Sequence, residues 1–267
     1  MPLPEPIRSF LYAYESLAER ARRTGWGLSL TDRRFPEIYD SNKAVVLEEA
    51  PRLTLDDLRR ELFPMLDEAG IRFEHLEFMC ASDPMPAFAE AEAVCGRSRP
   101  DVVMAFDADE VPSFRTVATV EEVREPDEAF WRSWVDSRSE FGVAMERRVV
   151  DQLLDRDRTV YGPAGMRMFA GSVNGELAGF CSLMSLEGAG YIDSVVTLRR
   201  HRRRGVASAI VCEAVRASRR NRDRATFLLA EQGGRPQGLY ERLGFRSLAR
   251  AVGFTRPRSP GEDGTYL

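Results

Sequence analysis

The feature that most constrains the fold of this chain is a short glycine-containing turn between two regular segments, Arg202-Arg203-Arg204-Gly205-Val206-Ala207. Before it, residues 191–198 are rich in β-branched side chains, which is typical of a strand. After it, apolar residues recur at helical spacing at positions 207, 210, 211, 214 and 215. A tight strand-to-helix turn gathers unpaired main-chain N–H groups at the positive end of the helix dipole, so the sequence predicts an anion site here.

Two small residues in this turn favour a close approach of the ligand to the main chain, because Gly205 has no side chain and that of Ala207 is short. The pattern resembles the acyl-CoA-binding motif of the GNAT superfamily of N-acyltransferases, which reads Arg or Gln, two residues, Gly, one residue, then Gly or Ala. Arg202, Gly205 and Ala207 fill its three fixed places. Downstream, Leu239-Tyr240-Glu241-Arg242-Leu243-Gly244-Phe245 looks like the short helix and Gly-Phe step that close the GNAT fold.

The resemblance implies an α/β protein in which helices pack on a mixed sheet, that is, the GNAT fold. Residues 225–230 supply the strand that the family places between the two motifs. Upstream, the segments 166–173 and 176–184 flank Asn174-Gly175, the dipeptide favoured by a type I′ hairpin turn. The first strand is expected at 116–121, followed by helices at 126–137 and 144–155. Phe130, Trp131 and Trp134 are spaced as the core face of a helix rather than as a substrate box.

The first part of the chain is expected to have the order strand, helix, strand, short helix, strand, which is also expected between Tyr191 and Phe254. A helix is expected at 7–23, a strand at 43–47, a helix at 55–69 between Thr54 and Gly70, a strand at 75–80, a short helix at 86–95 and a strand at 101–106. The loop that corresponds to the anion turn carries Glu48 and Glu49 and no glycine, so it would repel a diphosphate. We therefore predict a degenerate GNAT-like lobe at 1–112, a complete catalytic GNAT domain at 116–257 and a flexible tail at 258–267.

Charge is unevenly distributed over the 267 residues, whose formal net charge is −4. Residues 1–115 hold 14 Lys and Arg against 22 Asp and Glu, a net −8, and the remainder holds 24 against 20, a net +4. The balance argues against nucleic acid or an anionic membrane as the main partner. It also hints that an amine acceptor facing the acidic lobe is cationic.

Cysteine and histidine usage excludes several classes of site. The four cysteines, Cys80, Cys95, Cys181 and Cys212, have no CxxC spacing, which favours a reduced, cytoplasmic protein. With only His75 and His201, a metal site or a Ser-His-Asp hydrolase is not expected. No secretory signal and no run long enough to span a membrane is visible.

The resemblance also implies roles for single residues. The main chain from Arg202 through Arg203, Arg204, Gly205, Val206, Ala207 and Ser208 would hold the CoA pyrophosphate, and Val195, Val196 and Thr197 would pair with the pantetheine arm. A main-chain N–H near Val196 would stabilise the oxyanion. Tyr240 is the expected general acid, with core packing as the alternative. Asp193, the acid two residues before Val195, is the candidate base, with capping or ion pairing as the alternative and Glu187 as the runner-up.

Two positions depart from the family pattern. A proline common three residues before the motif's Arg is Arg199 here, and an asparagine that often precedes the tyrosine by seven is Gly233. Gln232 or Arg235 is a possible substitute for that amide. Side chains of Arg203 and Arg204 either contact phosphate or belong to a solvated basic surface.

The expected activity is transfer of an acetyl or other acyl group from acetyl-CoA to a primary amine of a small molecule or protein. One alternative is a non-catalytic acyl-CoA-binding regulatory module. Another is a nucleic-acid binder that uses the arginines of 199–204 and 216–224, which the acidic first lobe argues against. The chain is expected to act as a monomer or homodimer.

Overall fold

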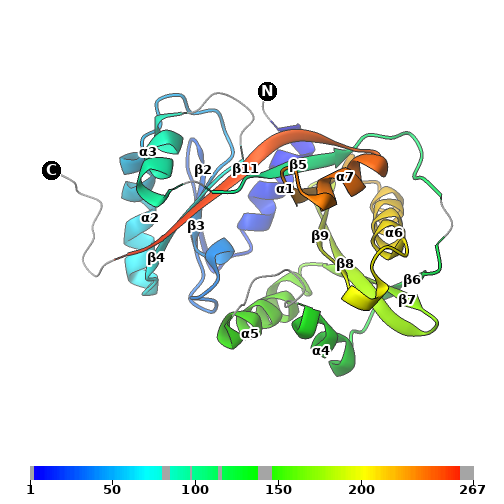
Figure 1. Ribbon diagram of the computed structural model, residues 1–267. Coiled ribbons are helices and arrows are strands. Elements are labelled where there is room, and N and C mark those ends of the chain that lie inside the picture. Colours follow the sequence, from blue (N-terminus) through cyan, green and yellow to red (C-terminus); the bar gives the residue numbers. More distant parts are fainter. Residues whose placement is uncertain (1–2, 80–84, 97, 114–115, 138–145, 259–267) are drawn as a thin grey trace. The chain divides into compact units, whose positions relative to one another are not determined.

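The computed structural model describes residues 3–79, 85–96, 98–113, 116–137 and 146–258 (Figure 1). Contacts divide the chain into two compact units, each built from segments distant in the sequence. Unit 1 comprises Met1–Val103, Leu229–Gly234 and Ser247–Leu267, and unit 2 comprises Met104–Leu228 and Arg235–Arg246. The predicted lobe boundaries of 1–112 and 116–257 stay a prediction.

Unit 1 is built on a mixed sheet whose strands are paired in the order β1-β2-β3-β4-β11. The pairing of β3 with β4 is parallel, and the other pairings are antiparallel. The elements are α1 (Glu5–Glu15), β1 (Arg20–Arg23), β2 (Gly27–Thr31), a 3-10 turn (Tyr39–Ser41), β3 (Lys43–Val46), α2 (Leu55–Ala69), β4 (Phe73–Phe78), α3 (Pro86–Cys95), the start of β5 (Asp101–Phe106) and most of β11 (Phe245–Pro257).

Helix α2 and the sheet enclose the core of unit 1. Leu58, Leu62 and Leu66 recur at helical spacing and are fully buried, which explains why this segment forms an amphipathic helix. They pack with apolar side chains of the strands and of α3, among them Ala44, Val46, Leu76, Phe78, Ala87, Ala91, Val252 and Phe254. Burial of this apolar stripe is the main force that holds α2 in place.

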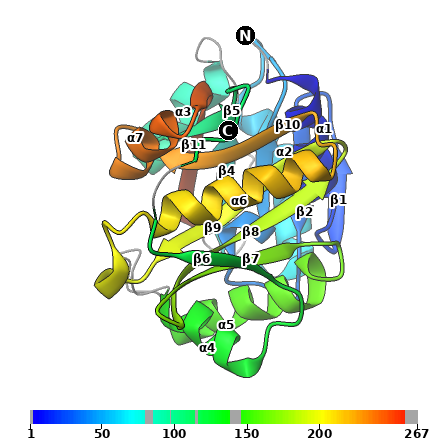
Figure 2. The same cartoon turned by 90° about the vertical axis from the view of Figure 1, so that its right-hand side faces the viewer.

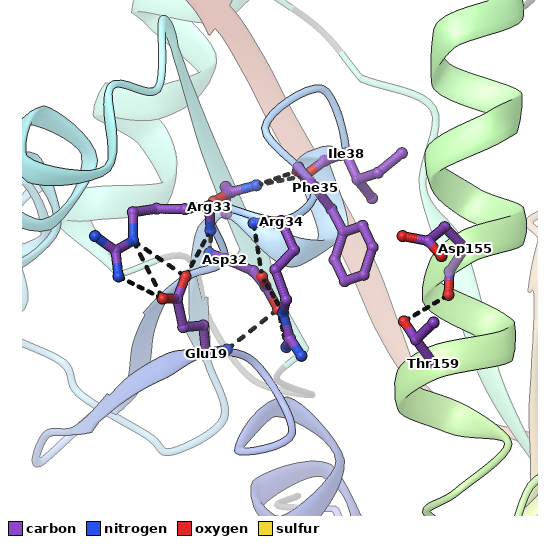
Figure 3. A network of polar contacts seen from close by, with 9 residues as sticks. Glu19, Asp32, Arg33, Arg34, Phe35, Ile38, Asp155 and Thr159 are labelled. Carbon is purple, nitrogen blue, oxygen red and sulfur yellow. Dashed lines mark hydrogen bonds and ion pairs between the residues drawn. The ribbon is translucent and has the colours of Figure 1, made fainter.

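A polar network fixes the chain between β2 and β3 (Figure 3). Arg33 forks onto Glu19, with its Nη2 2.5 Å from the carboxylate, and these hydrogen bonds lower the pKa of Glu19 to about 2. Arg34 binds the buried carboxylate of Asp32 in the same way. The amide of Asn42 accepts from the Asp32 N–H at 2.8 Å and donates to two carbonyls, so this loop is pinned from inside.

The strands of unit 2 are paired in the order β6-β7-β8-β9-β10, with β9 and β10 parallel and the other three pairs antiparallel. The elements are β6 (Thr119–Val123), α4 (Glu128–Ser137), α5 (Arg147–Arg156), a π-turn (Asp157–Tyr161), β7 (Arg167–Val173), β8 (Glu176–Leu186), β9 (Ala189–Thr197), a 3-10 turn (Arg199–His201), α6 (Val206–Arg220), the start of β10 (Ala225–Glu231) and α7 (Arg235–Arg242). The hairpin at Asn174 and Gly175 is confirmed, with φ of +54° and +79° at the two residues.

The two faces of this sheet carry different helices. Helix α6 lies along one face of β7, β8 and β9 (Figure 2), where Gly179 leaves room for Val206. Phe180, the next residue, points to the other face and contacts Phe130 of α4, with ring centroids 5.7 Å apart. Phe130, Trp131 and Trp134 are all buried, so the prediction that they belong to the core is confirmed.

One sequence expectation was wrong. The helix predicted over 7–23 ends at Glu15, and Arg20–Arg23 instead forms β1, which pairs antiparallel with β2. Arg258, the first residue of the predicted flexible tail, is buried: its N–H donates to the Arg72 carbonyl, and its guanidinium lies 3.9 Å from the Phe63 ring centroid. The rest of that tail, 259–267, lies outside the described residues, as does Cys80.

Among the described helices, none is long and apolar enough to cross a bilayer.

Candidate functional site

The predicted anion turn joins β9 to α6 through an exposed, left-handed stretch of main chain. Arg203 has a φ of +63°, and Gly205, the N-cap of α6, has a φ of +78°. No described side chain caps the helix. Within the described part of the chain, the N–H groups of residues 203–208 make no hydrogen bond. Six consecutive main-chain donors at the positive end of a helix of 15 residues are therefore available to an anion.

The arginine side chains of the turn divide into two kinds. Arg202 points back along its own chain, since its Nε donates to the main-chain oxygen of Thr197 at 3.2 Å. Arg203 and Arg204 are exposed and form no ion pair with any described residue. Below them, His201 is buried, and its Nε2 lies 3.0 Å from the Nε of Arg200. The turn therefore presents two unneutralised guanidinium groups beside its free N–H groups.

Strand β9 leaves a free edge next to this turn. Its parallel pairing with β10 covers Ala189, Gly190 and Tyr191 opposite Ala225, Thr226 and Phe227. From Ile192 to Thr197, no residue of β9 is paired with a described residue of β10. Main-chain groups of this stretch that point away from β8 are available to an extended ligand, although the Thr197 oxygen already accepts from Nε of Arg202.

A β-bulge at Ser194 shifts the alternation of side chains between the two faces of β9. Along β8, Phe180 and Ser182 are two residues apart, but their partners Val196 and Asp193 are three apart, and Ser194 has a φ of +52°. The argument that Asp193 shares a face with Val195 by simple alternation is therefore wrong, because the bulge puts Asp193 in phase with Val196. Sequence reasoning missed this bulge, and the chain offers no glycine there that would have signalled it.

Tyr240 lies on α7 and is 5 % exposed. Its ring packs on Phe245 at 5.9 Å between centroids, so the packing role is real. Burial, together with the nearby Cys181 and Asp193, raises the pKa of the Tyr240 hydroxyl well above its usual value of 10. The hydroxyl makes no hydrogen bond to a described residue. The side chain thus remains a protonated donor across the physiological range.

The two candidate bases lie at different places along β9. Asp193 is exposed in the unpaired part of the strand, and its main-chain oxygen accepts from the Ser182 hydroxyl at 3.3 Å. Its carboxylate makes no hydrogen bond or ion pair within the described chain. Glu187 sits with Gly188 in the two-residue turn before β9, at the paired end. Of these two acids, only Asp193 acts on the pKa of Tyr240.

The two positions that depart from the family pattern lie apart, Gly233 in the turn between β10 and α7 and Arg199 before the anion turn. Gly233 has a φ of +73° and belongs to unit 1, as does Gln232, whose N–H donates to the Pro100 carbonyl at 2.9 Å. Arg235 begins α7 in unit 2. Arg199 starts the 3-10 turn that precedes the anion turn.

The corresponding helix of unit 1 has a closed N-terminus. Thr54 and Asp57 form a capping box at α2, and the N–H of Leu55 donates to the Glu90 carboxylate at 2.7 Å. The preceding strand β3 is paired with β4 up to its last residue, Val46. Among the described residues, the capping box and Glu90 thus occupy main-chain donors at this helix end, and β4 covers the edge of β3.

Residues 124–245 match the family model described as the Acetyltransferase (GNAT) family. This segment is a GNAT-family domain. Both sequence motifs fall within it, and it contains every residue predicted for the site. No curated protein matches the chain at a significant level.

Solved structures share the GNAT fold over most of the chain. A GCN5-related N-acetyltransferase from Kribbella flavida is 18% identical, with a TM-score of 0.70, covering 98% of this chain and 99% of that chain. A putative GNAT acetyltransferase from Novosphingobium aromaticivorans is 16% identical, with a TM-score of 0.57, covering 96% and 100%. A tandem GNAT protein from the clavulanic acid biosynthesis pathway is 15% identical, with a TM-score of 0.55, covering 77% and 70%.

Proposed function

We propose that this protein is an N-acetyltransferase that moves an acetyl group from acetyl-CoA to a primary amine. The observation that carries the proposal is the open anion turn: free N–H groups at 203–208, left-handed φ at Arg203 and Gly205, and an uncapped α6. A pyrophosphate carries the charge and the acceptor oxygens that such a turn binds. Membership of the 124–245 segment in the GNAT family supports the same activity.

The free edge of β9 supports the binding of the carrier's arm. The pantetheine amides would pair with main-chain groups of Val195, Val196 and Thr197, which β10 leaves unpaired. This pairing would place the thioester carbonyl near a main-chain N–H at Val196. Such a donor stabilises the oxyanion of the tetrahedral intermediate by about 3–4 kcal/mol.

The proposal assigns proton transfer to two side chains, those of Asp193 and Tyr240. The amine must lose a proton to attack the thioester carbon, and Asp193 is the exposed carboxylate closest in chain position to the proposed oxyanion donor. As the tetrahedral intermediate collapses, the carbon–sulfur bond breaks and the thiolate takes a proton, which Tyr240 would supply. A phenol is protonated near neutral pH, and burial raises the pKa of the Tyr240 hydroxyl further, so the side chain is in its donor form before each turnover.

The two units together suggest a tandem arrangement. The order strand, helix, strand, short helix, strand occurs as β3-α2-β4-α3-β5 and again as β9-α6-β10-α7-β11. The likeness to a tandem GNAT protein supports the proposal that a degenerate lobe precedes the catalytic one. The closed N-terminus of α2 is consistent with one acyl-CoA per chain.

Calorimetric titration of the full chain with CoA and acetyl-CoA tests the proposal, followed by a thiol-release screen against small amines, polyamines and peptide amines. One binding event per chain and thiol release that depends on an amine are expected. Absence of heat with every CoA species would overturn it. Binding of duplex DNA or RNA that weakens steeply with salt would instead favour the hypothesis of a nucleic-acid-binding protein.

A further inference from the structure

A row of hydrogen-bonded side chains crosses three strands of unit 2 at the end of β9 where β10 is still paired. Ser185 of β8 and Thr226 of β10 both lie opposite Gly190 of β9. The Ser185 hydroxyl donates to Oδ2 of Asp223 at 2.7 Å, and the Ser218 hydroxyl donates to the same oxygen at 2.6 Å. Thr226 in turn donates to Ser218 at 2.8 Å. A continuous chain of hydrogen bonds thus joins β8 to β10 over the top of β9.

Gly190 leaves the space that this chain occupies. A Cβ at Gly190 would lie 2.3 Å from the Ser218 hydroxyl and 2.8 Å from Oδ2 of Asp223, both closer than atoms can approach. The φ of Gly190 is not left-handed, so the requirement for glycine is one of space. Ser218 is fully buried and Thr226 nearly so, and within a low-dielectric interior such satisfied networks are strong.

The end of α6 holds Asp223 in this position. Arg222 has a left-handed φ of +65°, its N–H donates to the Arg219 carbonyl, and the N–H of Asp223 donates to the Ser218 carbonyl at 3.1 Å. These bonds form a Schellman motif, which reverses the chain directly after the helix. The side chain of Asp223 is therefore aimed at Ser185 by main-chain geometry.

We infer that Asp223 is a positioning residue for acyl-CoA binding, which clamps β10 to β8 so that β9 parts from β10 only beyond Tyr191. The inference rests on the proposed function, since it assigns the free edge of β9 to the pantetheine arm. The clamp lies one row before the last paired row, Tyr191 opposite Phe227. Without it, the lateral position of β10 at that row is set by main-chain pairing and by the stacked rings of Tyr191 and Phe227, 4.9 Å apart, and the free edge is less well defined.

The test compares three variants of the full chain by calorimetric titration with acetyl-CoA. Asp223→Ala removes the shared acceptor, and we expect its Kd for acetyl-CoA to rise about tenfold or more, equal to about 1.4 kcal/mol. Asp223→Asn keeps a carbonyl oxygen that can accept from both serines, and its Kd is expected to stay within about threefold of wild type. Ser137→Ala is the matched control, because it removes a buried hydroxyl bond at the end of α4, far along the chain from the clamp.

Hydrogen exchange supplies a readout that does not depend on binding. In Asp223→Ala, amides of 189–191 and 225–227 should exchange faster, whereas Asp223→Asn and Ser137→Ala leave them unchanged. If Asp223→Ala fails to fold, Ser185→Ala removes one arm of the clamp and should show the same changes to a smaller extent.

If the wild-type protein binds no CoA species, the proposed function is wrong. Wild type that binds acetyl-CoA while Asp223→Ala binds it equally well overturns the clamp alone. A loss of affinity shared by Ser137→Ala also overturns it, because general destabilisation would then explain the effect.

Discussion

The side chain of Arg202 is hydrogen-bonded to the main-chain oxygen of Thr197, over a distance of 3.2 Å. The bond closes the loop between the end of β9 and the start of the anion turn. The arginine of the family motif therefore shapes the turn in this chain, while Arg203 and Arg204 remain exposed beside the free N–H groups. The turn itself is the part of the site on which the proposed function depends most.

Gly205→Ala should weaken acetyl-CoA binding by about tenfold or more, because a Cβ at a φ of +78° strains the turn by about 1–2 kcal/mol and obstructs its donors. Gly175→Ala is the matched control, since Gly175 has a φ of +79° in a hairpin turn with open space around it. Both variants should lose similar stability in urea, and only Gly205→Ala should lose affinity in calorimetry. Equal affinities in the two variants would remove the turn from the site.

Tyr240→Phe keeps the ring against Phe245 and removes only the hydroxyl. We expect kcat to fall by about 10²–10⁴, the usual contribution of a positioned general acid, with the Kd for acetyl-CoA unchanged. Steady-state kinetics and calorimetry on the same preparation measure the two quantities. A variant with full turnover would leave Tyr240 as a packing residue, and a non-catalytic module would show no turnover in either protein.

Ionisation of Tyr240 is also predicted to affect stability at high pH. Because its folded pKa is raised above 10, its contribution to the free energy of unfolding is fully present below pH 10 and is lost as the pH rises above it. The decline in stability above pH 10 should therefore be smaller in Tyr240→Phe than in wild type. Urea unfolding at pH 9 and pH 11 measures this difference, and identical declines would contradict it.

The two acids near β9 can be separated by amide substitutions. Asp193→Asn should lower kcat by about tenfold or more if this carboxylate takes the amine proton, whereas Glu187→Gln, in the hairpin turn before β9, should leave kcat within about twofold. Each variant keeps the size of its side chain, so both should fold as wild type. The reverse ranking would transfer the role to Glu187.

Unit 1 holds a carboxyl group with a strongly altered pKa. Burial, with a further contribution from Glu77, raises the pKa of Glu15 from 4.5 to about 7, against the opposing effect of Lys43, whose Nζ lies 2.9 Å away. The contribution of Glu15 to stability is therefore complete below pH 4.5 and lost as the pH rises through 7. Between pH 5 and 8, wild type should lose more stability than Glu15→Gln in urea unfolding.

His75 acts in the opposite direction over part of this pH range, because burial lowers its pKa. Both wild type and Glu15→Gln contain His75, so its contribution cancels when the free energy of unfolding of one is subtracted from that of the other at each pH. Glu61→Gln, at an exposed ion pair with Arg22, serves as a control that should change the pH dependence little. A Glu15→Gln curve parallel to that of wild type would contradict the assignment.

Features with a local signal were predictable from the sequence. The strand, turn and helix around Gly205, the hairpin at Asn174 and the cap at Thr54 each depend on residues a few positions apart, and the structure has all three. The helix expected over 7–23 failed because Arg20–Arg23 joins a sheet, and pairing with β2 overrides helical periodicity.

Features built by distant residues were not predictable. Glu90 reaches the N-terminus of α2 across 35 positions, and Ser185 reaches Asp223 across 38. The bulge at Ser194 depends on the register between β8 and β9, which no residue type in that stretch announces. Sequence reasoning thus found the turn and the two strands of the candidate site. It did not find the face of β9 on which Asp193 lies, or the hydrogen bonds of Asp223 to Ser185 and Ser218.

The closed N-terminus of α2 also bears on how this chain can evolve. Thr54, Asp57 and Glu90 bind main-chain N–H groups at that helix end, and the preceding strand β3 is paired with β4. A carrier site at this helix end would require several mutations, and each early one would destabilise unit 1 before any ligand could compensate. Selection would oppose those intermediates, so a carrier site is hard to evolve at this end of α2.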